Sequence, residues 1–259
     1  MNNILVITSI VLKELVRRKD AYVLLIITVL LTLLSGSVNF FGDLRMVRYM
    51  KELCLLLVWI SSVVIAVTLT ARQLHAERES RTLFSLLSKP LSRNELILGK
   101  FFGCWLACGV TLLVFYGFFV VTSVSRGENW RLLEYFQAFW LHWVMLGVIV
   151  SMVLCGALVF TAPSSNATIN LVIIVGILML GRHLGKLALH LGEPAQSVAL
   201  AIFYALPHLE FYDLRDLIIH DWPLVKWSAV GLATLYGAAY AAAFLGGSCV
   251  LFRRKPLNA

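Results

Sequence analysis

Residues 141–162 read LHWVMLGVIVSMVLCGALVFTA, a stretch that contains no Asp, Glu, Lys or Arg. An α-helix needs about 20 mostly apolar residues to cross the hydrocarbon core of a bilayer. The apolar residues follow one another without the two-residue alternation of a barrel strand, which is typical of a helix in lipid. The stretch therefore predicts a transmembrane helix.

Runs of similar length and hydropathy occur on both sides of this stretch, at residues 22–41, 53–73, 101–123, 168–189 and 227–251. In lipid, each segment must satisfy its own backbone hydrogen bonds, and a helix does so. With 60% of the residues hydrophobic and 14% charged, little chain is left for a soluble domain. We predict an all-α membrane protein, with six transmembrane helices in a single domain that comprises residues 1–259.

An even number of spans places both chain termini and the loop at residues 72–100 on the same side of the membrane. This side carries 13 of the 22 Lys and Arg residues but only 5 of the 14 acidic residues. Because loops rich in Lys and Arg stay in the cytoplasm, both termini are predicted to be cytoplasmic. The same distribution accounts for the net charge of +8 without a nucleic-acid partner.

Three segments outside the predicted spans have patterns of their own. In residues 1–20, apolar residues recur near helical spacing beside polar ones, which favours a helix that lies in the membrane interface. Residues 163–168 are mostly polar and predict a tight turn between two spans. In residues 190–226, the apolar run from Val198 to Leu206 is too short to cross a bilayer, so we expect an outer hairpin that is half-embedded or re-entrant.

Motifs for several kinds of chemistry are absent from the sequence. There is no nucleotide-binding loop of the G-x-x-x-x-G-K-[ST] type, no H-E-x-x-H and no G-x-S-x-G. Cys104 and Cys108 are one helical turn apart, but this spacing is common in helices and favours packing over metal binding. His142 lies near the end of a predicted span and is expected at the membrane interface. We therefore predict neither an enzymatic activity nor a metal site in this chain.

The placement of the charges bears on the source of energy for any transport. Every charged residue falls in a loop, in a terminus or at the edge of a predicted span. Carriers that are driven by protons or ions generally hold ionisable groups in the middle of the membrane. The sequence therefore disfavours a secondary carrier and favours a transporter that is driven from outside the membrane.

The loop at residues 72–100 has the pattern of two helices separated by a turn. Leu83, Leu86 and Leu87 form an apolar stripe beside a charged start. Pro90 ends this helix, because proline lacks a backbone N–H and its ring clashes with the preceding turn. Ser92 and Glu95 have the spacing of a capping box, which predicts the start of a second helix.

The same loop carries a resemblance to a known family. Its run is Glu77-x-x-x-Arg81-Thr82-Leu83-x-x-Leu86-Leu87-Ser88-Lys89-Pro90-Leu91-Ser92-Arg93-x-Glu95-x-x-x-Gly99-Lys100. This run resembles the first cytoplasmic loop of ABC-2-type transporter permeases, particularly the branch similar to the copper-enzyme maturation permease. The run Leu206-Pro207-His208-Leu209-Glu210-x-x-Asp213 is similar to the segment that precedes the last span in that branch.

The resemblance implies a permease subunit of an ABC exporter in the bacterial cytoplasmic membrane. It implies three kinds of partner, namely cytoplasmic ABC ATPase subunits, a second permease copy or paralogue, and membrane lipid. ATP and Mg would be bound by the ATPase, and no cofactor by this chain. The residues expected to contact the ATPase are Glu77, Arg78, Glu79, Arg81, Thr82, Leu83, Leu86, Lys89, Pro90 and Arg93. The outer hairpin, with Pro207, His208, Glu210 and Asp213, would cap the translocation path.

A second hypothesis assigns the chain to another class. It could anchor or scaffold an envelope or motility complex without moving a substrate. Among substrates, lipids, peptides, small hydrophobic toxins and polysaccharide precursors are all compatible with an apolar pathway. A homodimer and a heterodimer are equally compatible with the sequence.

Overall fold

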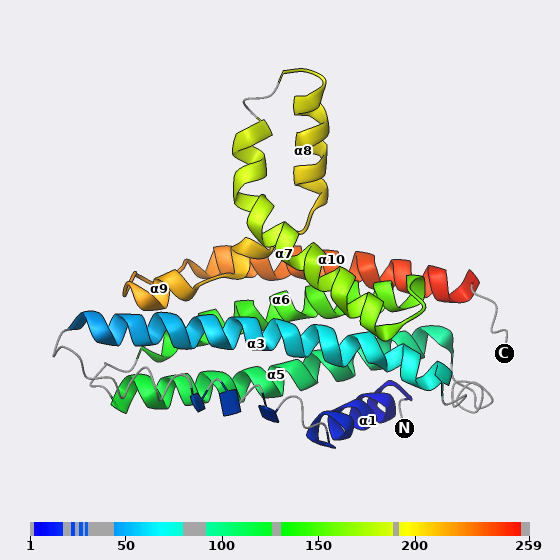
Figure 1. Ribbon diagram of the computed structural model, residues 1–259, viewed down its shortest axis with the longest axis horizontal. Helices are drawn as coiled ribbons and strands as arrows, with labels where there is room; N and C mark the ends of the chain where they lie inside the picture. Colours follow the sequence, from blue (N-terminus) through cyan, green and yellow to red (C-terminus); the bar gives the residue numbers. More distant parts are fainter. Residues whose placement is uncertain are drawn as a thin grey trace.

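The computed structural model describes residues 3–17, 44–79, 92–125, 131–188 and 192–254, together with residues 22–23, 26–27 and 29–30. These residues form helices and no strand, which confirms the all-α class (Figure 1). The α-helices are α1 (Asn3–Arg17), α3 (Leu44–Glu79), α5 (Arg93–Ser125), α6 (Leu132–Val159), α7 (Pro163–Ala188), α8 (Ala195–Ala205), α9 (Arg215–Ile219) and α10 (Trp227–Arg254). A short 3-10 helix, η1 (Leu209–Tyr212), precedes α9.

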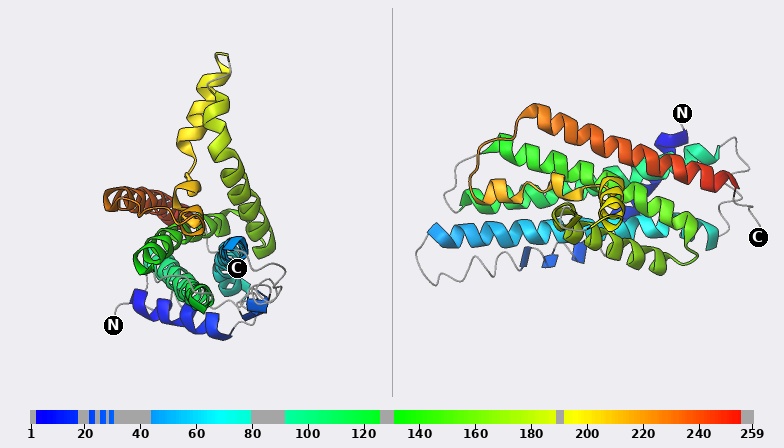
Figure 2. Two further views of the ribbon diagram at one scale, coloured as in Figure 1. Left: turned by 90° about the vertical axis from the view of Figure 1, so that its left-hand side faces the viewer. Right: turned by 90° about the horizontal axis from the view of Figure 1, so that it is seen from above.

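Four helices are long and apolar enough to cross a membrane, namely Arg48–His75 in α3, and α5, α6 and α10. They contain or largely overlap the predicted spans at 53–73, 101–123, 141–162 and 227–251. Each is 28 to 33 residues long, which is about 42–50 Å of helix and exceeds the roughly 30 Å hydrocarbon core. They run along one common axis (Figures 1 and 2). The predicted first span, at 22–41, lies largely outside the described residues, so the six-span topology stays a prediction.

The outermost described helices of the chain, α1 and the end of α10, lie toward the same end of this bundle (Figure 1). We call it the terminal end; there α3 ends at Glu79, α5 begins at Arg93 and α10 ends at Arg254. At the opposite end, α5 ends, and α6 and α10 begin. The described flanks of the loop at residues 72–100 and the end of α10 therefore lie together, and the membrane side of the termini stays a prediction.

The α1 helix lies across the bundle at the terminal end, as Figure 2 shows. It packs on α5, where glycines permit a close approach. A Cβ added at Gly99 would lie 2.8 Å from Cβ of Ile7, and one added at Gly103 would lie 2.7 Å from Cβ of Val11. Thr8 adds a hydrogen bond from its hydroxyl to the Gly99 carbonyl, at 3.3 Å. The helix predicted within residues 1–20 is therefore present.

The predicted turn at residues 163–168 is wrong. Pro163 is the first residue of α7, and the turn comprises Phe160–Ala162. Proline suits the first position of a helix, because no N–H is needed there and its φ is already helical. Asn166 then faces α6 instead of water, and its side-chain amide donates to the Val153 carbonyl at 3.2 Å. The polar residues of this stretch had suggested a solvent-exposed turn.

The α7 helix starts beside α3 and α6 and then leaves the bundle. Its later part pairs with α8, and the pair stands away from the bundle (Figures 1 and 2). No residue of α8 is buried. The segment then returns through η1 and α9, which pack against α6, α7 and α3. The depth of this segment in a membrane, and hence the re-entrant hairpin, stays a prediction.

A pair of tryptophans fastens α5 to α6 in the middle of the bundle. The Trp105 indole N–H donates to the Trp143 carbonyl at 2.9 Å, and the Trp143 indole N–H donates to the Trp105 carbonyl at 3.0 Å. The two rings stack with their centroids 4.6 Å apart. Each ring lies over a glycine of the other helix, Gly109 under Trp143 and Gly147 under Trp105. Small residues at these positions let the helices approach closely.

Candidate functional site

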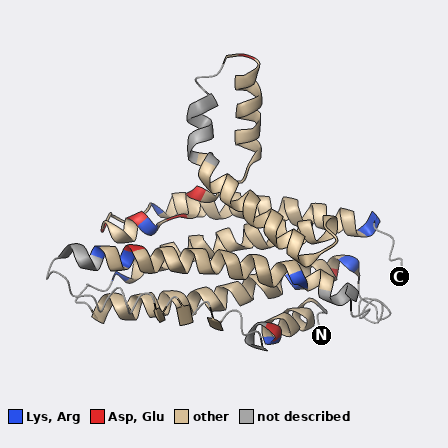
Figure 3. Cartoon of the chain, in the orientation of Figure 1, with Lys and Arg blue, Asp and Glu red and all other residues tan. Residues whose placement is uncertain are grey.

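Charged residues concentrate toward the two ends of the bundle, with a long uncharged section between them (Figure 3). The terminal end is the first candidate site, because the loop that carries the family resemblance connects the two helices that meet there. The described part of this end comprises α1, the end of α3, the start of α5 and the end of α10.

The start of α5 is a capping box. The Ser92 hydroxyl accepts a hydrogen bond from the Glu95 backbone N–H at 3.2 Å, and the Glu95 carboxylate accepts one from the Ser92 N–H at 2.7 Å. Two backbone donors that have no partner within the helix are thereby satisfied. The capping box predicted from the sequence is confirmed, and it gives α5 a defined first residue, Arg93.

Arg93 reaches from the start of α5 to the end of α10. Its guanidinium donates to the carbonyls of Phe252, at 2.8 Å, and of Arg253, at 3.2 Å. It also lies 5.6 Å from the centroid of the Phe252 ring. The last carbonyls of a helix lack partners within the helix and carry its negative dipole end, so a guanidinium suits this position. The structure thus gives Arg93, which we expected at the ATPase contact, a partner within its own chain.

A buried polar chain joins three helices at the same end. The Gln73 side chain of α3 donates to the Glu14 carboxylate of α1 at 3.0 Å, and it accepts from the Lys100 ammonium of α5 at 3.0 Å. Gln73 and Lys100 are both buried. The amide can serve both partners, because it has a donor and an acceptor. Nearby, the His75 ring joins α3 to the Phe160 carbonyl at 3.1 Å.

The other predicted contact residues lie on or beside these elements. Glu77, Arg78 and Glu79 belong to the last turn of α3, with side chains outside the described part of the structure. The remaining six residues of the predicted site lie within 80–91, outside the described residues: Arg81, Thr82, Leu83, Leu86, Lys89 and Pro90. The structure therefore fixes both flanks of the predicted coupling loop, at Glu79 and at Ser92.

The second candidate site is the segment after α8. The His208 ring contacts the Glu210 carboxylate at 3.1 Å, and the two side chains are only 9% and 10% exposed. Pro207 and His208 are buried. The Glu210 carboxylate lies against Gly181 of α7, where an added Cβ would meet its oxygens at 2.6 and 2.7 Å. Of the four residues predicted for the outer hairpin, Pro207 and His208 are therefore buried, and Glu210 packs against α7.

Asp213, the fourth residue, forms a bidentate pair with Arg215. The guanidinium donates to the two carboxylate oxygens at 2.8 and 2.7 Å. Its hydrogen bond with Asp213 raises the pKa of Arg215 above its usual value, so the guanidinium remains charged. Arg215 lies 5.0 Å from the ring centroid of Trp59. The sequence analysis did not single out Arg215, because nothing local to it indicates Trp59 as a partner.

The prediction of an interfacial His142 is wrong. His142 is buried, and its Nε2 lies 2.8 Å from the Ser62 hydroxyl of α3. Its Nδ1 lies 3.5 Å from the Tyr116 hydroxyl of α5. The prediction failed because α6 begins at Leu132, nine residues before the apolar run that was taken as the span. His142 is therefore inside the bundle and not at its edge.

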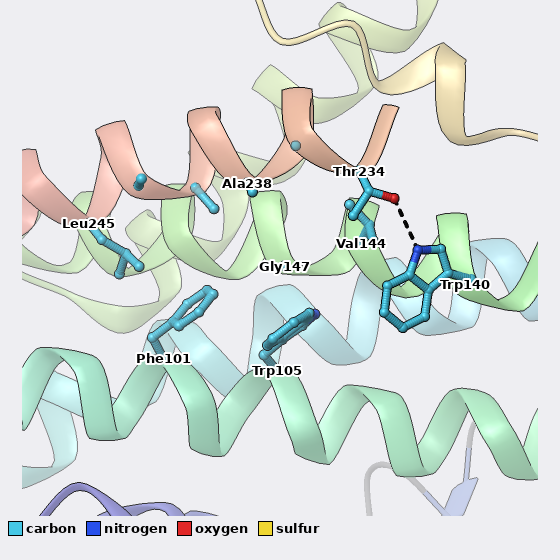
Figure 4. Close-up of a pocket in the computed structure, with 11 residues that line it drawn as sticks. Phe101, Trp105, Trp140, Val144, Gly147, Thr234, Ala238 and Leu245 are labelled. Carbon is cyan, nitrogen blue, oxygen red and sulfur yellow. Dashed lines mark hydrogen bonds between the residues drawn. The ribbon is translucent and has the colours of Figure 1, made fainter. Parts of the chain in front are cut away.

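An apolar cavity of about 240 Å³ lies between α5, α6 and α10 (Figure 4). Its lining residues come from these three helices: Phe101, Trp105, Trp140, Val144, Gly147, Thr234, Gly237, Ala238, Ala241, Ala242 and Leu245. The Thr234 hydroxyl accepts from the Trp140 indole N–H at 3.0 Å and donates to the Val230 carbonyl at 2.8 Å. The Thr234 hydroxyl is thus already hydrogen-bonded within the protein, and the surface that lines the cavity is apolar.

Within the described residues, no three His, Cys, Asp or Glu side chains lie close enough to hold a metal ion. Cys104 and Cys108 are both buried in α5 among apolar neighbours.

Comparison with known proteins gave one result for the family. Residues 8–257 match the family model described as ABC-2 family transporter protein. The match includes all four spanning helices and both candidate sites. A comparison with curated proteins gave no match.

Proposed function

Because the chain belongs to the ABC-2 family of transporter proteins, we propose that it is the membrane-spanning subunit of an exporter driven by ATP. Membership makes it a multi-pass permease subunit of an ABC transporter and not itself a catalyst, since permeases of this family work with ATPase subunits. The direction of transport and the particular ATPase are part of our proposal. So is the branch similar to the copper-enzyme maturation permease.

The coupling site in this proposal is the loop between α3 and α5, with Glu77, Arg78 and Glu79 at its start. The strongest support for this coupling site is the set of hydrogen bonds between the helices that flank the loop. The helices on its two sides are joined to α1 through Gln73, and α5 is joined to α10 through Arg93. A displacement imposed on the loop would therefore act on four helices together.

The mechanism follows from this arrangement. ATP binding would draw two ATPase subunits together, and each would move the loop seated on it. Two permease copies would then change between inward-facing and outward-facing arrangements as rigid bodies. ATP can shift this equilibrium only if the ATPase binds the two arrangements with different affinity, which charge pairs at the loop would provide.

The segment from Pro207 to Asp213 would close the outer side of the translocation path. The close packing of this segment supports the proposal: Glu210 lies on Gly181, and Tyr212 lies on Gly237, where an added Cβ would lie 2.7 Å from the Tyr212 hydroxyl.

In this proposal both termini are cytoplasmic, and the protein resides in the bacterial cytoplasmic membrane. A second permease copy or a paralogue completes the path.

The first test is co-purification with the ATPase encoded beside this chain. We expect the wild type to form a stable complex and the double variant Glu77→Ala, Arg81→Ala to lose it while still folded. The matched control is Asp216→Ala, Lys226→Ala, which also removes one acid and one base. Both control residues are exposed and lie toward the opposite end of the bundle. The control should keep the complex.

The result of this co-purification also distinguishes the exporter function from the scaffold function. If no ATPase associates with the wild type under any condition, the exporter is excluded and the scaffold function becomes the better one. If the control variant loses the complex as the test variant does, contact with the ATPase is not confined to the loop.

A further inference from the structure

Arg93 lies at the end of the predicted coupling loop, where it is hydrogen-bonded to the last turn of α10. It is the first residue of α5, next to the capping Ser92, and its guanidinium holds two carbonyls at the end of α10. Phe252, one of these two residues, is 2% exposed, so the contact is packed as well as hydrogen-bonded. Charged donors make stronger hydrogen bonds than neutral ones, which suits a contact that must transmit displacement.

The same two helices form opposite walls of the apolar cavity. Phe101 of α5 lines the cavity eight residues after Arg93, and Leu245 of α10 lines it seven residues before Phe252. Both separations are about two helical turns. A shift of the end of α10 relative to the start of α5 would therefore change the width of the cavity.

We propose that Arg93 is a positioning residue that passes displacement of the α5 start to α10. This inference rests on the proposed function, because the displacement comes from the ATPase. It assigns Arg93 a role within the permease and not at the ATPase surface. When α10 follows α5, the cavity walls move together; when the contact is lost, the end of α10 is released.

The first measurement needs only the permease in detergent. Hydrogen–deuterium exchange is followed in peptides that cover residues 245–254, for wild type, Arg93→Gln, Arg93→Lys and Arg254→Gln. Because hydrogen bonds from a charged group to the end of α10 are lost, we expect exchange at least about tenfold faster in Arg93→Gln. Arg93→Lys, which keeps the charge, should be intermediate. Arg254→Gln removes an exposed arginine from the same helix end and should match the wild type.

The second measurement adds the ATPase and compares exchange in the presence and absence of ATP. In wild type we expect the exchange of the 245–254 peptides to depend on ATP. In Arg93→Gln the ATPase should still co-purify, but this dependence should be lost, and Arg93→Lys should partly restore it. A purely structural role would leave the ATP dependence in place.

Two results would overturn the inference. One is equal exchange in Arg93→Gln and wild type without ATPase. The other is an ATP-dependent change in α10 that persists in Arg93→Gln while the ATPase is bound. If the wild type binds no ATPase, the proposed function fails, and the first measurement still decides whether Arg93 holds α10.

Discussion

At the scale of single residues, the contact between Glu210 and Gly181 shows how closely the segment after α8 is packed. The carboxylate occupies the space that a side chain at position 181 would take. Glu210 is held there by His208, which is itself surrounded by Phe203 and Phe211, with ring centroids 4.4 and 5.2 Å away. A buried ionisable pair in such surroundings is costly unless its geometry is kept.

We therefore predict that Gly181→Ala destabilises the protein. The added methyl group would overlap the carboxylate, and overpacking of this kind costs about 1–3 kcal/mol. The measurement is the free energy of unfolding in detergent. Gly176→Ala is the matched control, because it lies in the same helix and has no atom within 4 Å of the added Cβ. It should be neutral or slightly stabilising, since alanine favours a helix more than glycine does. Equal effects of the two substitutions would mean that Glu210 does not lie on Gly181.

At the scale of helices, close approach is achieved by pairing a bulky residue with a glycine. Two tryptophans do this between α5 and α6, and Ile7 and Val11 do it between α1 and α5. In lipid, apolar side chains gain little from leaving the solvent, so packing and hydrogen bonds between helices carry more of the stability. The last span differs, because Gly231, Gly246 and Gly247 have no atom within 4 Å of an added Cβ. Only part of its small-residue surface is used for packing among the described residues.

We predict that Trp143→Phe lowers the free energy of unfolding by about 0.5–1.5 kcal/mol, the contribution of one hydrogen bond. Phenylalanine keeps an aromatic ring over Gly109 but cannot donate to the Trp105 carbonyl. Trp222→Phe serves as the control, because Trp222 is 55% exposed and lies in the turn before α10. Its substitution should change the unfolding free energy by less than about 0.5 kcal/mol. A Trp143→Phe protein as stable as the wild type would argue against the paired indole bonds.

At the scale of the whole molecule, the bundle has two different ends. The terminal end contains α1, the end of α10 and the flanks of the predicted coupling loop. The opposite end is held by ion pairs, in which Arg131 contacts Asp221 at 2.8 Å and Glu134 at 3.0 Å, and Lys51 contacts Asp221 at 3.7 Å. If the terminal end receives an ATPase, it must face the cytoplasm.

This orientation can be measured with a thiol reagent that does not cross membranes. We expect Trp222→Cys to react in intact cells, because Trp222 is exposed at the opposite end. Arg254→Cys should react only after the membrane is permeabilised. The wild type is the control for its own five cysteines, of which three are buried and two are partly buried. The reverse pattern would place the terminal end outside and exclude a cytoplasmic ATPase at that site.

The helical class, four of the spans and the start of α5 were predicted correctly from the sequence. These features depend on local patterns, namely a long apolar run or two residues at capping distance, which need no knowledge of distant contacts. The two wrong predictions also came from local patterns, because polar residues were assumed to lie at the ends of helices. The polar stretch 163–168 was interpreted as a turn although Pro163 starts a helix, and His142 was placed at a span edge although α6 begins earlier.

The sequence by itself determined that this protein is a helical membrane protein, because hydropathy acts segment by segment. Only the tertiary structure decided that Arg93 holds the end of α10, that Glu210 lies on Gly181 and that Gln73 joins α1 to α5. These partners are far apart along the chain, and their meeting depends on how the helices pack, where a glycine in one helix makes room for a side chain of another.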